Sequence, residues 1–318
     1  MGSQSLEPTT DVERAAWALT HGGLVVIPTE TVYGLAADAT DAAAVSRIFS
    51  VKGRPSGHPL IVHLADVEDL DRWAVDVPPD ARRLATLSWP GPLTVIVPRS
   101  GVVPDEVTGG RDSVGLRVPA HPMTLELIRL TGKGLAAPSA NRFGAVSPTT
   151  AAHVVDDLAE FLDPGLDVVL DGGPCPVGVE STIVDFCSAP PQILRAGGIT
   201  PEQVTDLLST NRSRTTLANA SGPARASGML DSHYAPRSNV VLVESLSEAA
   251  VASAAQPGAV VLDMSDDLTV AARTLYAQLR LADDRGVATI IAVLPPPVGL
   301  GHAIRDRLTK AAAPRTAS

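Results

Sequence analysis

The chain has no excess of positive charge and few aromatic residues. Its 318 residues carry 25 Lys and Arg against 35 Asp and Glu, a formal net charge of −10. Proteins that bind duplex DNA usually need a basic surface that releases counterions from the phosphates. Aromatic residues make up only 3% of the chain, too few for the stacking platforms of a single-strand binder. No stable DNA binding is therefore expected, although a local basic pocket for one nucleotide stays open.

Cysteine is scarce, and long apolar runs are missing. Cys175 and Cys187 form neither a CxxC pair nor a zinc ligand set. A chain of this length needs no disulfide scaffold, so both are interpreted as ordinary thiols of a reducing compartment. The first residues lack the basic and apolar segments of a signal peptide, and no apolar run approaches the roughly 18 residues of a membrane span. The sequence predicts a soluble, cytoplasmic protein with no membrane partner.

Several common catalytic signatures are also missing. The chain has no HExxH motif, no GxxxxGK[ST] phosphate loop and no GxGxxG fingerprint, and no Ser-His-Asp order is evident. His58 and His63 are five residues apart, which does not match a helical zinc pair. We predict no metal ligand from the protein and no organic cofactor.

Apolar runs that read as strands alternate with helical segments along the chain, which favours an α/β architecture. In the first part these strands are expected at residues 24–29, 59–64, 93–98, 114–119, 167–173 and 180–186. Pro122 and Thr200 mark helix starts, and Gly132 marks a helix end.

Residues 209–226 are small, polar and without period, which is typical of a linker. Three more apolar runs follow, at 240–244, 259–264 and 288–294, and helical stretches separate and follow them. We therefore divide the chain into a domain at 10–208, a linker at 209–237 and a small α/β domain at 238–313.

Six loop segments hold most of the side chains that suggest chemistry. They are rich in hydroxyls, cations and glycines, and contain no nucleophile–base pair. Such a set binds and orients a polyanion, which indicates catalysis by positioning and electrostatics. The segments are PTETVYGL at 28–35, KGRPSGHPL at 52–60, SVGLRVPAHP at 113–122, APSANRFGAVSPT at 137–149, GVESTIVD at 178–185 and ILRAGG at 193–198.

Structural roles stay open for three of these residues. Lys52 can complement a helix C-terminus, and Ser147 can cap a helix that starts near Thr149. Arg117 lies in an apolar strand, where a charge is costly unless it is paired. Its partner is either a carboxylate of the protein or a carboxylate of a ligand.

These segments, with WPGPLTVIV at 89–97, closely resemble in their order and spacing the motifs of the YrdC-like threonylcarbamoyl-AMP synthase family. The resemblance covers about residues 10–208, and residues 279–308 look like the C-terminal domain of the family's long, two-domain form. It implies a twisted open mixed sheet with helices and a large nucleotide-binding cavity, followed by a small doubly wound, Rossmann-like domain.

The resemblance also implies a reaction, in which L-threonine, bicarbonate or CO2 and ATP give L-threonylcarbamoyl-AMP and pyrophosphate. Mg²⁺ is expected to arrive with ATP. The product would pass to a tRNA-threonylcarbamoyl transferase complex, which modifies adenosine 37 of ANN-decoding tRNAs. Alternatives are an RNA-binding module of the same fold and a related enzyme that forms another carbamoyl-adenylate.

Carried over motif by motif, the resemblance assigns roles to single residues. The catalytic set would be Lys52, Arg54, Ser139 and Asn141. L-threonine would be held by Thr31, His63, Arg117, Ala137 and Ser181, with Arg117 on its carboxylate. ATP would contact Lys52, Arg54, His58, Ser113, Ser139, Asn141, Ser147 and Arg195.

The linker departs from the family pattern. The family usually reads PGMKYRHYAP where this chain reads SGMLDSHYAP at 227–236. His233 and Tyr234 persist and are expected to contact the site, whereas Leu230, Asp231 and Ser232 replace the basic residues. Less positive charge would then lie near ATP.

Overall fold

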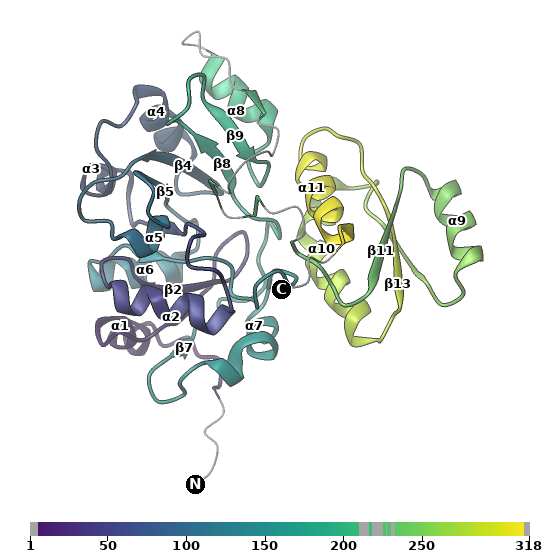
Figure 1. Ribbon diagram of the computed structural model, residues 1–318, viewed down its shortest axis with the longest axis horizontal. Helices are drawn as coiled ribbons and strands as arrows, with labels where there is room; N and C mark the ends of the chain where they lie inside the picture. Colours follow the sequence, from purple (N-terminus) through teal and green to yellow (C-terminus); the bar gives the residue numbers. More distant parts are fainter. Residues whose placement is uncertain (1–5, 210–215, 218–224, 227, 230–232, 315–318) are drawn as a thin grey trace.

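The computed structural model describes residues 6–209, 216–217, 225–226, 228–229 and 233–314. They form two domains side by side, a large one around a long sheet and a small one that ends the chain (Figure 1). Leu230, Asp231 and Ser232, where the linker departs from the family pattern, lie outside the described residues.

The large domain begins with helices and strands that alternate along the chain, as the sequence predicts. Its helical elements are α1 (Val12–Thr20), α2 (Ala42–Lys52), η1 (Val67–Asp69), α3 (Leu70–Trp73), α4 (Pro79–Ser88), α5 (Asp105–Thr108), α6 (Pro122–Thr131), α7 (Ala151–Leu158), η2 (Ala159–Phe161) and α8 (Pro201–Leu208). Its strands are β1 (Val25–Ile27), β2 (Gly34–Asp38), β3 (Ile61–His63), β4 (Leu93–Pro98), β5 (Ser113–Arg117), β6 (Leu135–Ala136), β7 (Val168–Val169), β8 (Thr182–Asp185), β9 (Gln192–Arg195) and β10 (Thr216–Leu217).

Local sequence explains where several helices begin and end. Asp41 caps α2 by accepting hydrogen bonds from two backbone N–H groups, and Gly53 ends it at φ 62°. Thr200 forms a capping box with Gln203 at the start of α8. Pro122 opens α6, as predicted from the sequence.

In the described part of the chain, ten strands form one mixed sheet in the order β10-β9-β8-β4-β5-β3-β6-β2-β1-β7. Pairs such as β4–β5 are antiparallel, whereas β3–β5 and β4–β8 are parallel. The mixed sheet that the family resemblance implies is confirmed. β10 comes from residues 216–217, inside the expected linker, and extends the edge of this sheet beside β9.

β2 is absent from the strands that the sequence predicts. Its residues, GLAAD at 34–38, are small, and Gly, Ala and Asp are disfavoured in strands. Pairing with β1 on one side and β6 on the other, with full burial, outweighs that local preference.

The small domain is a three-stranded parallel sheet with helices on both faces. In the described residues its order is β11 (Asn239–Val243), β13 (Thr289–Val293), β12 (Val260–Asp263). Helices α10 (Leu268–Asp284) and α11 (Gly301–Ala312) cover one face, and α9 (Leu246–Ala255) covers the other (Figure 1). The layered α/β prediction is correct, but the last strand lies in the middle, unlike the 3-2-1 order of a Rossmann half.

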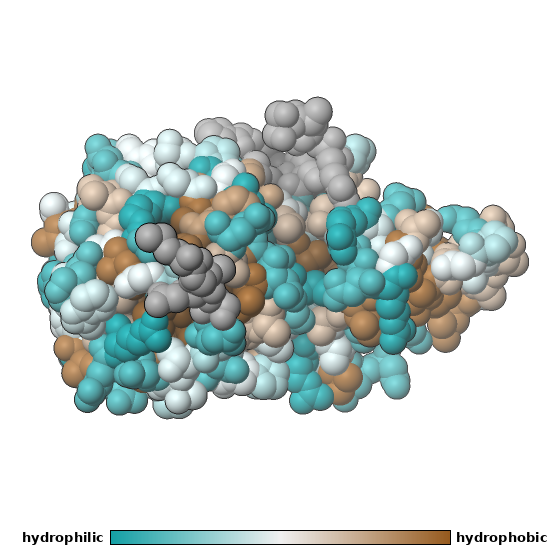
Figure 2. All heavy atoms as spheres, turned by 90° about the horizontal axis from the view of Figure 1, so that it is seen from below, coloured by the Kyte–Doolittle hydropathy of each residue, from teal (hydrophilic) through white to brown (hydrophobic). Residues whose placement is uncertain are grey.

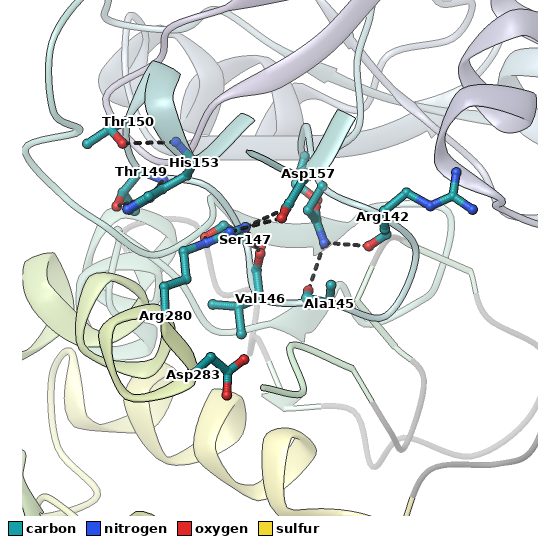
Figure 3. A network of polar contacts seen from close by, with 12 residues as sticks. Arg142, Ala145, Val146, Ser147, Thr149, Thr150, His153, Asp157, Arg280 and Asp283 are labelled. Atoms are coloured by element: carbon teal, nitrogen blue, oxygen red, sulfur yellow. Dashed lines mark hydrogen bonds and ion pairs between the residues drawn. The ribbon is translucent and has the colours of Figure 1, made fainter. Parts of the chain in front are cut away.

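Polar contacts connect the two domains. Arg280 of α10 holds Asp157 of α7 through Nη1–Oδ1 and Nη2–Oδ2 contacts of 3.0 and 2.6 Å (Figure 3). A second connection is buried: Tyr276 of α10 and Arg307 of α11 both donate to Glu180 of the large domain. The small domain is therefore ordered against the large one by charge as well as by apolar packing.

The surface is of mixed polarity, and the two cysteines are not paired. Figure 2 shows hydrophobic and hydrophilic residues interspersed over the visible face. Among the residues that the structure describes, none of the helices has the length and apolar character that a membrane crossing requires. Cys175 is buried and Cys187 is exposed, and both are free thiols.

Candidate functional site

A cavity that is partly open to solvent lies where loops leave the central strands, next to the linker. Its space is about 50 Å³, which corresponds to roughly four waters at about 10–15 Å³ each. The residues that line it are Thr29, Thr31, Val32, Tyr33, Gly34, Arg54, Ile61, His63, Arg117, Ala137, Pro138, Ser139, Glu180, Ser181, Arg195, Gly228, His233 and Tyr234.

The turn after β1 presents hydroxyls to the cavity. Thr29 Oγ1 accepts hydrogen bonds from the N–H groups of Thr31 and Val32, at 3.1 and 3.2 Å. It also lies 2.8 Å from Thr31 Oγ1. A threonine that bonds backbone groups two and three residues ahead stabilises a tight turn. This turn fixes the Thr31 hydroxyl in the wall of the cavity.

Arg117 is paired within the protein. Its Nη2 lies 2.6 Å from Glu30 Oε1, and its Nε donates to the carbonyl of Gly91 at 3.2 Å. Burial by itself would raise the pKa of Glu30, but the charge and hydrogen bond of Arg117 hold that pKa below its ordinary value. Of the two partners that the sequence leaves open for Arg117, the structure contains the carboxylate of the protein. The Arg117 side chain also lines the cavity.

His63 lies at the end of β3 and is almost fully buried. Burial first, and the charge of Arg117 second, lower the pKa of His63 to about 3, so the ring is neutral at neutral pH. Its Nδ1 makes no hydrogen bond in the structure. The neutral ring also lines the cavity.

Ser181 and Arg195 form the opposite wall. Arg195 Nη2 donates to Ser181 Oγ at 3.1 Å, and Arg195 Nε donates to the Ser181 carbonyl at 3.0 Å. Ser181 Oγ also lies 2.8 Å from Thr94 Oγ1. The hydroxyl is thus fixed in direction beside a guanidinium.

Lys52 is buried next to the loop that contains Ser139 and does not line the cavity. Its Nζ donates to the Ser139 carbonyl at 2.6 Å and to the carbonyl of Asn141. Burial, together with the charge of Arg54, lowers the pKa of Lys52 well below its ordinary value. The Asn141 amide is likewise occupied, because it donates to Ala145 O at 2.7 Å. The expected KxR…SxN set therefore assembles, but only Arg54 and Ser139 reach the cavity surface.

Arg54 lies at the cavity beside an aromatic side chain. Its guanidinium carbon is 5.7 Å from the ring centroid of Phe143, within cation–π range. Burial lowers the pKa of Arg54 to about 10, so it remains charged at neutral pH. His58 packs edge-on against the same ring at 5.5 Å and does not line the cavity.

Two more residues expected at ATP lie elsewhere. Ser113 starts β5, paired with Pro98, and is not among the cavity residues. Ser147 is fully buried and donates to Glu180 Oε1 at 2.7 Å. Ser147 does not cap α7 either, since Thr150 does so. The contact of Ser147 with the nucleotide stays a prediction.

Sequence analysis missed two carboxylates, Glu30 and Glu180. Both stand inside the segments that it selected, PTETVYGL and GVESTIVD, each between hydroxyl and apolar residues. An acidic residue in a segment that is otherwise buried is a signal of pairing. The hydroxyls and cations of these segments indicate a binding site, whereas the two carboxylates pair with cations in the fold: Glu30 with Arg117 and Glu180 with Arg307.

The linker residues His233 and Tyr234 close one side of the cavity, as expected. Tyr234 has φ 61°, a left-handed conformation that is unusual for an aromatic residue. Ala235 N donates to Gly144 O at 2.9 Å, which ties this segment to the large domain. Gly228 has φ 81°, and a Cβ there would lie 2.4 Å from Tyr234 Oη. Glycine is required at this point of the linker.

Ten of the residues predicted from the sequence thus meet at one cavity. They are Thr31, Arg54, His63, Arg117, Ala137, Ser139, Ser181, Arg195, His233 and Tyr234. No group of three or more His, Cys, Asp or Glu side chains within the described ranges could hold a metal ion.

Two family models match the chain. The model described as "Telomere recombination", of the Sua5/YciO/YrdC type, matches residues 17–197. The model described as "Threonylcarbamoyl-AMP synthase, C-terminal domain" matches residues 199–313.

Similar proteins align along nearly the whole chain. A threonylcarbamoyl-AMP synthase of Pyrococcus abyssi is 39% identical over 93% of this chain and 92% of its own length. A threonylcarbamoyl-AMP synthase of Bacillus subtilis is 37% identical over 96% of this chain and 93% of its own length. The crystal structure of P. abyssi Sua5 complexed with L-threonine is similar with a TM-score of 0.87 at 38% identity, and the match covers 95% of this chain and 94% of that one.

Proposed function

Because the chain belongs to the threonylcarbamoyl-AMP synthase family, we propose that it is a nucleotidyltransferase that makes L-threonylcarbamoyl-AMP and pyrophosphate from L-threonine, bicarbonate or CO2 and ATP. The observation that carries this proposal is the cavity, whose hydroxyls and guanidiniums come from the family's motif segments. The related Pyrococcus protein was crystallised with L-threonine.

The chemistry needs positioning more than it needs a reactive side chain. The amine of threonine adds to CO2 and loses a proton, which gives a carbamate. A carbamate oxygen then forms a bond to the α-phosphorus of ATP, and the bond between the α-phosphorus and the bridging oxygen breaks to release pyrophosphate. Holding the carbamate in line with that bond and neutralising the phosphate charge supplies most of the catalysis.

We assign the cavity to threonine. The amino acid has a hydroxyl, a carboxylate and a methyl group, and the cavity offers hydroxyls from Thr31 and Ser181, a guanidinium from Arg117 and a methyl from Ala137. The neutral ring of His63 can accept a hydrogen bond, because its pKa is about 3. Room for about four waters, each of which occupies about 30 Å³ in the liquid, agrees with an amino acid as occupant.

We assign the phosphates of ATP to Arg54, Arg195 and the Ser139 hydroxyl at the cavity surface, with Lys52 and Asn141 supporting that loop from behind. Mg²⁺ would come with ATP and stabilise the charge of the leaving pyrophosphate. The product would serve a tRNA-threonylcarbamoyl transferase downstream.

The proposal is tested by pyrophosphate release from ATP. Release should require L-threonine and bicarbonate together. With L-serine in place of L-threonine, the rate of release should be at least about 10-fold lower, because serine lacks the methyl group and one such contact is worth about 1–3 kcal/mol. Arg54→Ala should lower kcat about 100-fold, the usual loss for one electrostatic donor. Arg82→Ala is the matched control, since Arg82 makes an exposed ion pair on α4 with Asp71. Release that ignores threonine would refute the proposal.

A further inference from the structure

A fully buried arginine of the small domain reaches the wall of the cavity. Arg307 lies in the middle of the apolar face of α11, between Ile304 and Ala311. A charge in that position is costly unless it is paired. Its Nη1 contacts the neighbouring Asp306 at 2.6 Å, but its Nε points out of the small domain and donates to Glu180 Oε2 at 2.8 Å.

Glu180 is held from both domains. Ser147 of the large domain donates to Oε1 at 2.7 Å, whereas Tyr276 and Arg307 of the small domain supply the remaining hydrogen bonds. Burial alone would raise the pKa of Glu180, but the charges of Arg307 and Arg195 lower it to about 2. The carboxylate is therefore ionised, and it immediately precedes Ser181 in the chain.

The same guanidinium also fixes the linker side of the cavity. The guanidinium carbon of Arg307 is 5.2 Å from the ring centroid of Tyr234, and the Tyr234 and Tyr276 rings are 5.7 Å apart. One turn further along α11, Lys310 donates to Gly228 O at 2.7 Å. Two separate walls, the 180–181 segment and the linker, are thus anchored on α11.

We propose that the small domain completes the substrate cavity, and that Arg307 is the positioning residue through which it acts by holding Glu180 and Tyr234. The inference rests on the proposed function, because it concerns how that same cavity keeps the shape that threonine requires. Arg307 does not line the cavity and is not a catalytic residue.

Other contacts of the small domain lack this property and provide controls. His302, on the same helix, contacts Glu202 across the domain boundary at 3.1 Å and is partly exposed. Gly299, just before the same helix, donates from its backbone N–H to Glu202 at 3.4 Å, and none of these three residues lines the cavity. These contacts connect the domains without holding a cavity wall.

The test is steady-state pyrophosphate release with threonine varied at saturating ATP and bicarbonate. Arg307→Lys keeps the buried charge but loses the fork geometry of the guanidinium. It should raise the KM for threonine about tenfold and change kcat less, because the binding wall is loosened more than the phosphate contacts. Tyr276→Phe removes only the hydroxyl donor and should raise that KM about threefold.

The controls separate positioning from simple docking. His302→Ala and Glu202→Gln should keep the threonine KM within about twofold, even where loss of this domain contact lowers the melting temperature. An equal rise in KM in these two variants would overturn the inference in favour of docking alone. A folded Arg307→Lys with the wild-type KM would overturn it outright. If Arg307→Lys does not fold, an unchanged KM in Tyr276→Phe does the same.

Calorimetry of L-threonine binding separates this inference from the proposed function. It needs no turnover, and Arg307→Lys should bind threonine about tenfold more weakly than the wild type. A wild-type protein that neither binds nor uses threonine refutes the proposed function and this inference with it. A wild type that does both, beside an equally competent Arg307→Lys, refutes the inference alone.

Discussion

The buried ion pair between Arg117 and Glu30 allows a sharp test of how the cavity is built. The two side chains are 4% and 9% exposed, and their charged atoms are 2.6 Å apart. Arg117→Leu leaves the buried Glu30 carboxylate without its guanidinium, with the hydrogen bond from the Ala120 N–H at 3.0 Å still in place. An uncompensated buried charge typically costs about 3–5 kcal/mol. The free energy of unfolding should fall by about that amount.

The double variant Arg117→Leu/Glu30→Gln removes both charges. Because replacing a buried pair by neutral groups is often close to neutral, its free energy of unfolding should recover to within about 2 kcal/mol of the wild type. Urea titrations followed by circular dichroism measure both values. Threonine KM, measured on the folded double variant, then reports whether Arg117 also binds the substrate carboxylate.

Three outcomes decide between the readings of Arg117. A single variant that loses less than about 1 kcal/mol would show that the pair does not hold the wall. A single and a double variant of equal instability would refute the argument from an unpaired charge. A stable double variant with wild-type KM would leave Arg117 as a purely structural partner of Glu30 and would remove the carboxylate role proposed for it.

The linker, the buried histidines and the loop behind the cavity give three further predictions. Gly228→Ala should raise the threonine KM at least about fivefold, because φ 81° and the 2.4 Å approach to Tyr234 Oη both exclude a Cβ; wild-type kinetics would contradict this. Burial lowers the pKa of His63 and of His233 to about 3, so both stay neutral in the fold while the unfolded chain protonates below about 6.5. The free energy of unfolding should then decrease as the pH is lowered from 6.5 to 5, by up to about 1.4 kcal/mol per pH unit for each ring. In urea titrations, a variant with Gln at both positions should show a weaker dependence of this free energy on pH. Lys52→Met should lower kcat at least about tenfold and leave threonine binding unchanged, because Lys52 holds the loop that carries Ser139 and Asn141. Unchanged turnover would exclude this supporting role of Lys52.

Segments whose local chemistry agrees with the fold were predictable from the sequence. α6 and α8 carry their start signals in Pro122 and Thr200, and the structure begins both helices there. Strands such as β4 and β13 are short, mostly apolar runs rich in β-branched residues, which favours a buried strand. β2 was not predictable in this way, because its small residues become a strand only through pairing with neighbours distant in the chain.

The candidate site shows the same division. Its residue types and their motif order stand in the sequence, and ten of the predicted side chains meet at one cavity. What each side chain touches depends on segments far apart in the chain. Lys52, for example, holds backbone carbonyls 87 and 89 residues away. Ser147, expected at the nucleotide, holds Glu180.

The family, the alternation of strands and helices, and the loops that carry the chemistry can all be identified from the sequence, because they are properties of local residue patterns and their order. The pairing of carboxylates with cations depends on how the chain folds. Glu30 and Arg117 are separated by 87 residues, and Glu180 and Arg307 by 127. Partners at such distances are selected by the burial that packing imposes, since a charge removed from water must find its partner wherever the fold brings one.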